Sequence, residues 1–318
     1  MLVLWFMRLR GLTCLGALFP ILPAACNSSP PMVTPPAAFT FTSADDRFFD
    51  FYSWDGRLIQ HLSTSLFVYP SRDGRYYVGG RGEPEHIFSR SGTDMGVIPN
   101  GGAPGRLWAQ DADFICGTVA NAVGQRVMYV TDIHGKAREI PTDGPIRELA
   151  GCSITTGRAA VYSADGVSWD VRSLEDGHVL APIPITGQAD GFGLSADVSW
   201  LTVTTGFPGG AMETIVYRLS DGAVSAKLPD VWGQQFTPDS RYLLVNNLKL
   251  NTYSMLDWRT GHVAWIRARY LRGALESDST TNMMLLDVTA DPSAEADQNR
   301  QFWIVSPKGV FTQFHPRE

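Results

Sequence analysis

The sequence predicts an all-β fold. Gly and Pro are frequent, at 31 and 20 of 318 residues, and no window carries a long apolar stripe at helical spacing. Short alternating apolar runs instead recur between turn residues. With 44% hydrophobic and 18% charged residues, the chain has enough apolar material for one large domain or two ordinary ones.

The unit that repeats is clearest in the second half of the chain. A short apolar run at 231–236 is followed by a polar turn and an apolar strand candidate at 241–246. Two alternating segments, 252–258 and 262–267, are then joined through Gly261, where glycine supplies the positive φ of a tight hairpin. Four strands in about forty residues are typical of one blade of a β-propeller.

Hairpin glycines recur at spacings of 36 to 48 residues, close to the length of one blade. They are Gly56, Gly92, Gly135, Gly177, Gly222, Gly261 and Gly309. Seven turns predict seven blades of four antiparallel strands. The alternative is six blades plus a closing segment, because the first unit, 39–62, has room for about three strands and would pair with the C-terminal segment.

A second motif repeats at the turn before the second strand. It reads PSRDGRYYVGG at 70–80, LSADVSWLTV at 194–203 and FTPDSRYLLV at 236–245, and Trp54-Asp55 forms a WD dipeptide. These segments resemble the phrase "SPDGRYLAV, then WD-x-x-TG" of bacterial WD-repeat and Tol-system (YVTN-like) propellers. The resemblance implies a propeller over residues 38–318 and no particular activity.

The N-terminus predicts export. Arg8 and Arg10 precede an apolar core at 11–22 that is too short to span a bilayer as a permanent helix, and small residues follow it. We therefore expect a signal peptide at residues 1–25, with translation starting at Met1 or Met7.

Cys26 follows the small residues, so the stretch resembles the lipobox of bacterial lipoproteins. The resemblance implies a diacylated Cys26 that anchors the protein to the cell membrane or outer membrane, facing the periplasm or the exterior. Leu22 lies one place upstream of the usual lipobox leucine, so processing by the general signal peptidase is the alternative. Residues 26–37, rich in Ser and Pro, predict an extended tether.

The formal net charge of −6 and the scattered basic residues predict no nucleic-acid partner. The densest basic cluster, Arg267, Arg269 and Arg272, is more typical of a solvated edge.

One set of charged residues is a candidate ligand site. The starts of the predicted innermost strands carry Asp111, Asp113, Glu148, Asp190 and Arg272. Carboxylates from three blades at one channel mouth could bind a divalent cation or an amine, as in metal-dependent propeller hydrolases of the lactonase type. Polar residues are also expected at the mouth of a wet channel, and this simpler interpretation is favoured, without a cofactor.

The two downstream cysteines, Cys116 and Cys152, align at the end of the first strand in adjacent blades. A disulfide is one interpretation for an exported protein. Equivalent positions on neighbouring strands can exceed the roughly 7 Å Cα limit, however, so two separate buried thiols are favoured.

Two further patterns have structural interpretations. Residues 257–265 resemble the tryptophan-docking repeat of quinoprotein propellers, which implies that Trp265 packs one blade on the next; an oxidoreductase would need a copurifying quinone. His134, His178 and His262 fall beside hairpin turns in different blades, so we expect them to be exposed.

These observations favour an exported, lipid-anchored propeller that binds a partner and catalyses nothing. Envelope proteins or wall polymers are the candidate partners, because propeller faces built from variable loops bind without leaving a short motif in sequence.

Overall fold

The computed structural model describes residues 38–42, 48–63, 67–80, 84–98, 107–109, 111–144, 146–163, 168–184, 189–206, 211–278, 281–289 and 300–316. The chain divides into a unit Met1–Pro35 and a unit Pro36–Glu318. The predicted signal peptide, Cys26 and the tether lie outside the described residues. Within the described part of the chain, no helix is long and apolar enough to cross a membrane.

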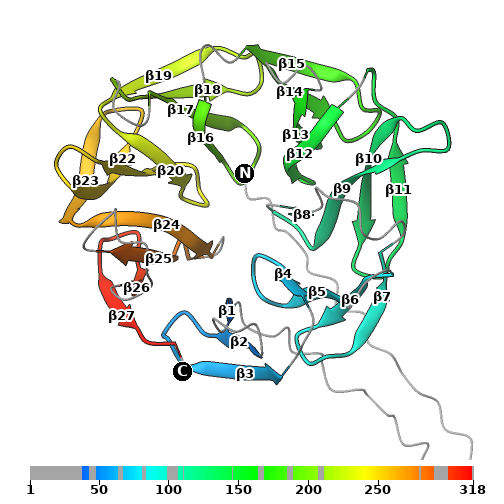
Figure 1. The fold of residues 1–318 in the computed structure, drawn as a ribbon, viewed down its shortest axis with the longest axis horizontal. Coiled ribbons are helices and arrows are strands. Elements are labelled where there is room, and N and C mark those ends of the chain that lie inside the picture. The colour runs from blue at the N-terminus through cyan, green and yellow to red at the C-terminus, as the bar shows by residue number, and fades with distance from the viewer. Residues whose placement is uncertain are drawn as a thin grey trace, which may run out of the picture. The chain divides into compact units, whose positions relative to one another are not determined.

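Seven antiparallel sheets surround a central channel in the unit Pro36–Glu318, and each sheet is one blade (Figure 1). Six blades have four strands and the first has three, and the described residues contain no helix. The all-β class and the seven-bladed propeller are confirmed, and the alternative of six blades plus a closing segment is wrong.

The strands of each blade follow one another in the sequence. Blade 1 has β1 (Phe39–Thr42), β2 (Phe48–Tyr52) and β3 (Leu58–Ser63); blade 2 has β4 (Phe67–Pro70), β5 (Tyr76–Gly80), β6 (His86–Ser89) and β7 (Asp94–Val97); blade 3 has β8 (Leu107–Trp108), β9 (Phe114–Ala120), β10 (Arg126–Asp132) and β11 (Ala137–Ile140); blade 4 has β12 (Ile146–Ser153), β13 (Arg158–Ser163), β14 (Ser168–Ser173) and β15 (Val179–Pro184). Blade 5 has β16 (Ala189–Leu194), β17 (Trp200–Thr205), β18 (Glu213–Arg218) and β19 (Val224–Pro229); blade 6 has β20 (Trp232–Phe236), β21 (Leu243–Asn247), β22 (Thr252–Asp257) and β23 (His262–Ala268); blade 7 has β24 (Tyr270–Ser277), β25 (Met284–Thr289), β26 (Gln301–Val305) and β27 (Phe311–Phe314).

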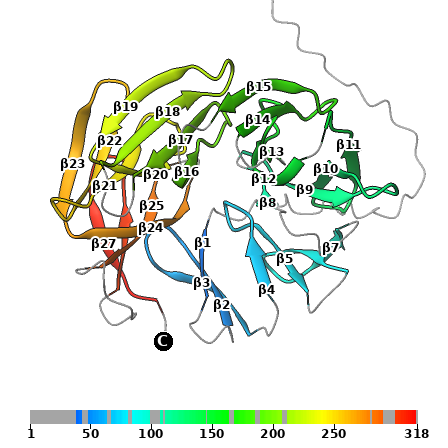
Figure 2. The ribbon, with the colours of Figure 1, turned by 45° about the horizontal axis from the view of Figure 1, so that its top comes forward.

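In blades 2 to 7 the chain runs from the channel to the rim, so that β4, β8, β12, β16, β20 and β24 are innermost (Figure 1). Figure 2 shows the outer strands β15, β19 and β23 along the rim of the same ring. The middle strands carry most of the core; β25, for example, is buried along its whole length.

Blade 1 has no described innermost strand. Its hairpin glycine, Gly56, joins β2 to β3, whereas the glycine of each later blade joins the third strand to the fourth. The strands β1, β2 and β3 therefore correspond to the second, third and fourth strands of the other blades.

Aromatic packing closes the ring between blades 1 and 7. Phe39 and Tyr52 of blade 1 form one buried cluster with Leu285, Ile304 and Phe314 of blade 7, and the Phe39 and Phe314 ring centroids are 5.0 Å apart. The expected strand pairing between the first unit and the C-terminal segment is wrong, because β27 pairs with β26 in its own blade.

The repeated turn before the second strand of a blade is stabilised by its own side chains. In blade 2 the Ser71 hydroxyl donates to Asp73 Oδ1 at 2.9 Å and accepts from the Tyr76 amide at 3.0 Å, while Asp73 Oδ1 accepts from the Arg75 amide at 3.0 Å. The same three bonds recur in blades 5 and 6, where the corresponding residues are Ser195, Asp197, Ser199 and Trp200, and Thr237, Asp239, Arg241 and Tyr242. The motif thus encodes a turn.

The hairpin glycines have two requirements. All seven have positive φ, between 70° and 86°. Several also touch the preceding blade: a Cβ on Gly177 would lie 1.6 Å from the Pro141 carbonyl oxygen, and one on Gly135 would lie 2.4 Å from that of Val97. These hairpins rest on the end of the preceding blade's outer strand, at a distance that admits no side chain.

Cys116 and Cys152 form a disulfide between blades 3 and 4, with Cα atoms 6.5 Å apart. The expectation of two separate thiols is wrong. Cys116 lies on the second strand of its blade, β9, because the two-residue strand β8 occupies the innermost position. The two cysteines are therefore not at equivalent positions, and both belong to one buried cluster.

We expect Gly177→Ala to destabilise the protein more than Gly261→Ala. Both residues have φ near +75°, which strains alanine by about 1–2 kcal/mol. A Cβ on Gly261 meets nothing within 4 Å, whereas one on Gly177 requires the Pro141 backbone to move, for about 1–3 kcal/mol more. Urea denaturation of both variants measures the difference. Equal losses of stability would contradict the close contact between blades.

Replacing both cysteines, as Cys116→Ala with Cys152→Ala, should lower the free energy of unfolding by up to about 4 kcal/mol, since the crosslink spans 36 residues of sequence. Urea denaturation with and without reductant measures this. Reductant should weaken the wild type and leave the double variant unchanged. A wild type that is insensitive to reductant would overturn the assignment.

Candidate functional site

Three of the sequence-predicted channel-mouth residues, Asp111, Asp113 and Arg272, contact different partners. Asp111 fixes the turn after β12: its carboxylate accepts hydrogen bonds from the Ser153 hydroxyl at 2.7 Å and from the amides of Ile154 and Thr155 at 2.8 and 2.9 Å. This carboxylate joins blade 3 to blade 4 and has a structural role.

The other predicted residues lie elsewhere. Asp113 pairs with Arg75 Nη2 at 2.9 Å, and burial and the nearby Asp73 raise the pKa of Asp113 against the opposing effect of Arg75. Glu148 is exposed on β12, and Asp190 lies on β16. Arg272 Nε is 3.9 Å from Asp287.

Among the residues that the structure describes, no three or more His, Cys, Asp or Glu side chains are placed to hold a metal ion. The shared metal required by the hydrolase hypothesis therefore has no ligand set in this part of the chain.

A cavity of about 380 Å³ lies at the channel between inner strands of four blades. Its walls come from β4 and β5 of blade 2, β8 and β9 of blade 3, β20 of blade 6 and β24 of blade 7. The lining residues are Tyr69, Pro70, Arg72, Val78, Leu107, Trp108, Ala109, Ile115, Gln235, Leu275, Glu276 and Ser277. None of the sequence-predicted site residues is among them.

The polar wall of the cavity is centred on Ser277. Arg72, which follows β4, donates from Nη2 to Ser277 Oγ at 2.7 Å, and Gln235 Nε2 lies 3.5 Å from the same oxygen. Arg72 thus connects blade 2 directly to blade 7.

An irregularity in β24 places three successive residues on this cavity. The register with β25 shifts between Ala274 and Glu276, which is the signature of a β-bulge. A regular strand would turn alternate side chains to opposite faces. At the bulge Leu275, Glu276 and Ser277 all line the cavity.

Glu276 is a half-buried acid at the cavity wall. Its Oε1 accepts a hydrogen bond from the Thr40 hydroxyl of β1 at 3.1 Å, and this is its one hydrogen bond among the described residues. Desolvation raises the pKa of Glu276 to about 7, against the opposing effects of Thr40 and Arg72. The part of the side chain that remains exposed belongs to the cavity lining.

Arg72 is the matching half-buried cation. Burial lowers the pKa of its guanidinium, and the negative charges of Glu276, Asp111 and Asp278 oppose that effect. A cation and an acid therefore share one wall of the cavity, in surroundings where charge is poorly solvated.

The opposite wall is apolar. Val78 and Ile115 pack where blades 2 and 3 meet, with Trp108 beside them, and Leu107 packs on the neighbouring cluster between blades 3 and 4. The Trp108 indole donates to the Tyr69 carbonyl oxygen at 2.9 Å, which fixes the ring between the two blades. The cavity thus combines an apolar wall with an opposing pair of charges.

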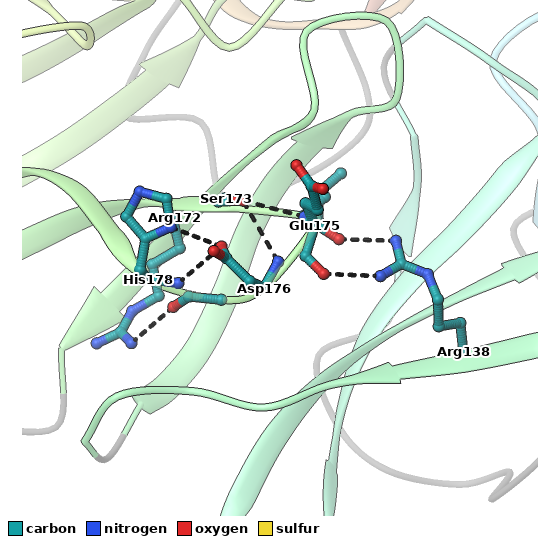
Figure 3. Close-up of polar contacts among 8 residues, drawn as sticks. Arg138, Arg172, Ser173, Glu175, Asp176 and His178 are labelled. Atoms are coloured by element: carbon teal, nitrogen blue, oxygen red, sulfur yellow. Dashed lines mark hydrogen bonds and ion pairs between the residues drawn. The ribbon is translucent and has the colours of Figure 1, made fainter.

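The histidines lie away from this cavity. His134, His178 and His262 are exposed in three different blades, as predicted. Figure 3 shows the turn that contains His178, whose Nδ1 is 2.6 Å from Asp176. In the same view Arg138 of blade 3 donates to the Glu175 carbonyl oxygen at 3.0 Å, which holds this hairpin against the neighbouring blade.

Trp265 has the packing role that the tryptophan-docking resemblance implies. Its ring meets Phe311 of blade 7 edge-on at 4.9 Å and Tyr253 of its own blade at 5.8 Å. It therefore packs blade 6 against blade 7.

Sequence reasoning missed both charged residues of the cavity. Arg72 sits within the repeated PSRDGR turn, where it reads as one more polar turn residue. Glu276 interrupts the apolar pattern of 270–277, and an acid in a predicted inner strand is the one signal that could have identified it.

Comparison with known proteins identifies the fold. No protein-family model matches the sequence, and no curated protein matches it. Among solved structures, KlHsv2 with loop 6CD replaced by a Gly-Ser linker is similar at a TM-score of 0.57 and 12% identity, over 89% of this chain and 95% of that one. Kluyveromyces lactis Hsv2 is similar at a TM-score of 0.55 and 11% sequence identity, over 85% of this chain and 94% of that one.

The C-terminal WD40 domain of Sif2 gives a TM-score of 0.49 at 14% identity, over 85% of this chain and 81% of that one. At these identities the likeness to Hsv2 concerns the fold alone. The chain is accordingly a seven-bladed β-propeller whose fold is similar to that of Hsv2.

We expect Glu276→Gln to change how stability depends on pH. Because the folded pKa of about 7 exceeds the ordinary 4.5, the folded state retains a proton that the unfolded state loses as pH rises through this window. Wild-type stability should therefore fall between pH 4.5 and 7, by at most about 3 kcal/mol before allowance for partial exposure. The variant, which cannot ionise, should lack this fall.

Urea denaturation at pH 4.5, 5.5, 7 and 8 tests this expectation, with Glu148→Gln as the exposed control. The stability difference between Glu276→Gln and wild type should grow with pH, and the control should show no such trend. A constant difference across the series would mean that the Glu276 side chain is well solvated.

Proposed function

We propose that this protein is exported, anchored to the membrane through a lipidated Cys26, and acts as a non-catalytic binding or scaffold protein of the cell envelope. The fold carries the proposal: a WD40-like seven-bladed propeller is consistent with such a role. The export signal and the lipobox resemblance at residues 1–26 support the location.

The construction of the blades suits a binding platform. Side-chain hydrogen bonds fix the repeated turns, and the disulfide and inter-blade aromatic contacts hold blades to one another. A rigid frame of this kind presents its connecting loops in fixed relative positions, which favours recognition of a large partner. Envelope proteins or wall polymers are the partners we propose.

The anchor can be tested with two cysteine variants. Cys26→Ala should move the protein from the membrane fraction to the soluble envelope fraction, and mass spectrometry should show that its N-terminal peptide lacks the diacylglyceryl group present in wild type. Cys14→Ala, in the apolar core of the signal, is the matched control and should remain in the membrane fraction. If the N-terminal peptide of the wild-type protein carried no diacylglyceryl group, the proposed lipid anchor would be contradicted.

Crosslinking in intact cells then tests the scaffold. We expect a reproducible envelope partner to copurify with tagged wild type and with Cys14→Ala, and to be depleted with Cys26→Ala. No crosslinked species above background in wild type would remove the main support for a binding platform.

A further inference from the structure

We propose that the cavity lined by Arg72 and Glu276 binds a small zwitterion, namely an α-amino acid with an apolar side chain. This goes beyond the envelope role and depends neither on the anchor nor on a protein partner. The inference rests on three features of the cavity: opposite charges on one wall, apolar residues on the other, and a volume suited to a small ligand.

The charges favour a ligand that carries both signs. Among the described residues the Glu276 carboxyl has one hydrogen bond, from Thr40 to Oε1, so Oε2 can accept from an ammonium group without breaking a described contact. The Arg72 guanidinium, held at the same wall through Ser277, can donate to a carboxylate.

The geometry of β24 brings these groups close together. Arg72 contacts the side chain of Ser277, which immediately follows Glu276, and the bulge turns both β24 residues toward the cavity. The ammonium and carboxylate of an α-amino acid are attached to one carbon, so they need recognition groups that are near neighbours. Gln235, directed at Ser277 Oγ, adds a polar group beside them.

The apolar residues of the cavity lining can contact the apolar side chain of the ligand. Leu107 and Trp108 of blade 3 are half-buried and line the cavity above the buried Val78 and Ile115, and Leu275 of β24 is 43% exposed. Covering this surface would remove apolar area from water. A volume of about 380 Å³ lies near the lower end of the range typical of small-molecule sites.

Other ligand classes fit less well. An amine alone would satisfy Glu276 and place a second cation beside Arg72, whereas a carboxylate alone would satisfy Arg72 and crowd Glu276. A neutral sugar would hydrogen-bond to the wall but leave the apolar side without a matching group. The zwitterion is the one class that matches both walls.

Calorimetry on the purified full-length chain can separate these classes with three probes of one shape. L-leucine carries both charges, 4-methylpentanoate lacks the ammonium group, and 3-methylbutylamine lacks the carboxylate. We expect L-leucine to bind at pH 7.5 at least about tenfold more tightly than either analogue, since each loses a charge-assisted hydrogen bond. No binding of L-leucine, or equal binding of all three, would overturn the proposal, as would tighter binding of glucose.

Variants then assign the groups. Glu276→Gln should bring the affinity for L-leucine close to that for 4-methylpentanoate, because the amide cannot pair with the ammonium group. Arg72→Gln should similarly remove the preference for L-leucine over 3-methylbutylamine. Glu148→Gln, exposed on β12, should bind as wild type. Each variant is first shown by urea denaturation to be folded, and a folded Glu276→Gln that keeps the wild-type order of the probes would refute the role of Glu276.

Discussion

The contact that organises this propeller is the seating of a hairpin on the outer strand of the preceding blade. At Gly177 and Gly135 the hairpin backbone lies so close to the neighbouring carbonyl oxygen that a Cβ would overlap it. Each of these two positions therefore requires both a positive φ and the absence of a side chain, and glycine provides both. Each such contact fixes the position of a blade relative to the one before it, although the hairpin at Gly261 lacks it, since a Cβ there would meet nothing within 4 Å. The disulfide and the Trp265 contact strengthen particular junctions of this frame.

The candidate site is built from contacts that link the first, second and seventh blades. Arg72 of blade 2 donates to Ser277 of blade 7, and Thr40 of β1 donates to Glu276 of blade 7. Two neighbouring charges of opposite sign are then held in poorly solvated surroundings. Such an arrangement is costly for folding alone, which is why it is the most informative place in the molecule to look for a ligand.

The proposed envelope role and the proposed ligand site concern different parts of the protein. The proposed partner-binding role would use the loops of the ring, whereas the cavity lies among inner strands of four blades. If both exist, a ligand that contacts blades 2, 3, 6 and 7 at once would stabilise the frame on which the loops are mounted. The cavity could then affect the platform without itself touching the partner.

The sequence by itself determined the all-β class, the seven blades, the turn motif and the packing role of Trp265, because each rests on local residue types repeated at a regular spacing. It could not place Cys116, since a two-residue strand, β8, leaves no recognisable pattern and shifts the alignment by one strand. It also grouped Asp111 and Asp113, whose side chains have separate neighbours, with Glu148 and Asp190, and missed Arg72 and Glu276. Those two residues are 204 positions apart, and only the closure of the ring and the bulge in β24 bring them to one cavity. Contacts between distant segments depend on how blades pack together, and no local pattern encodes that.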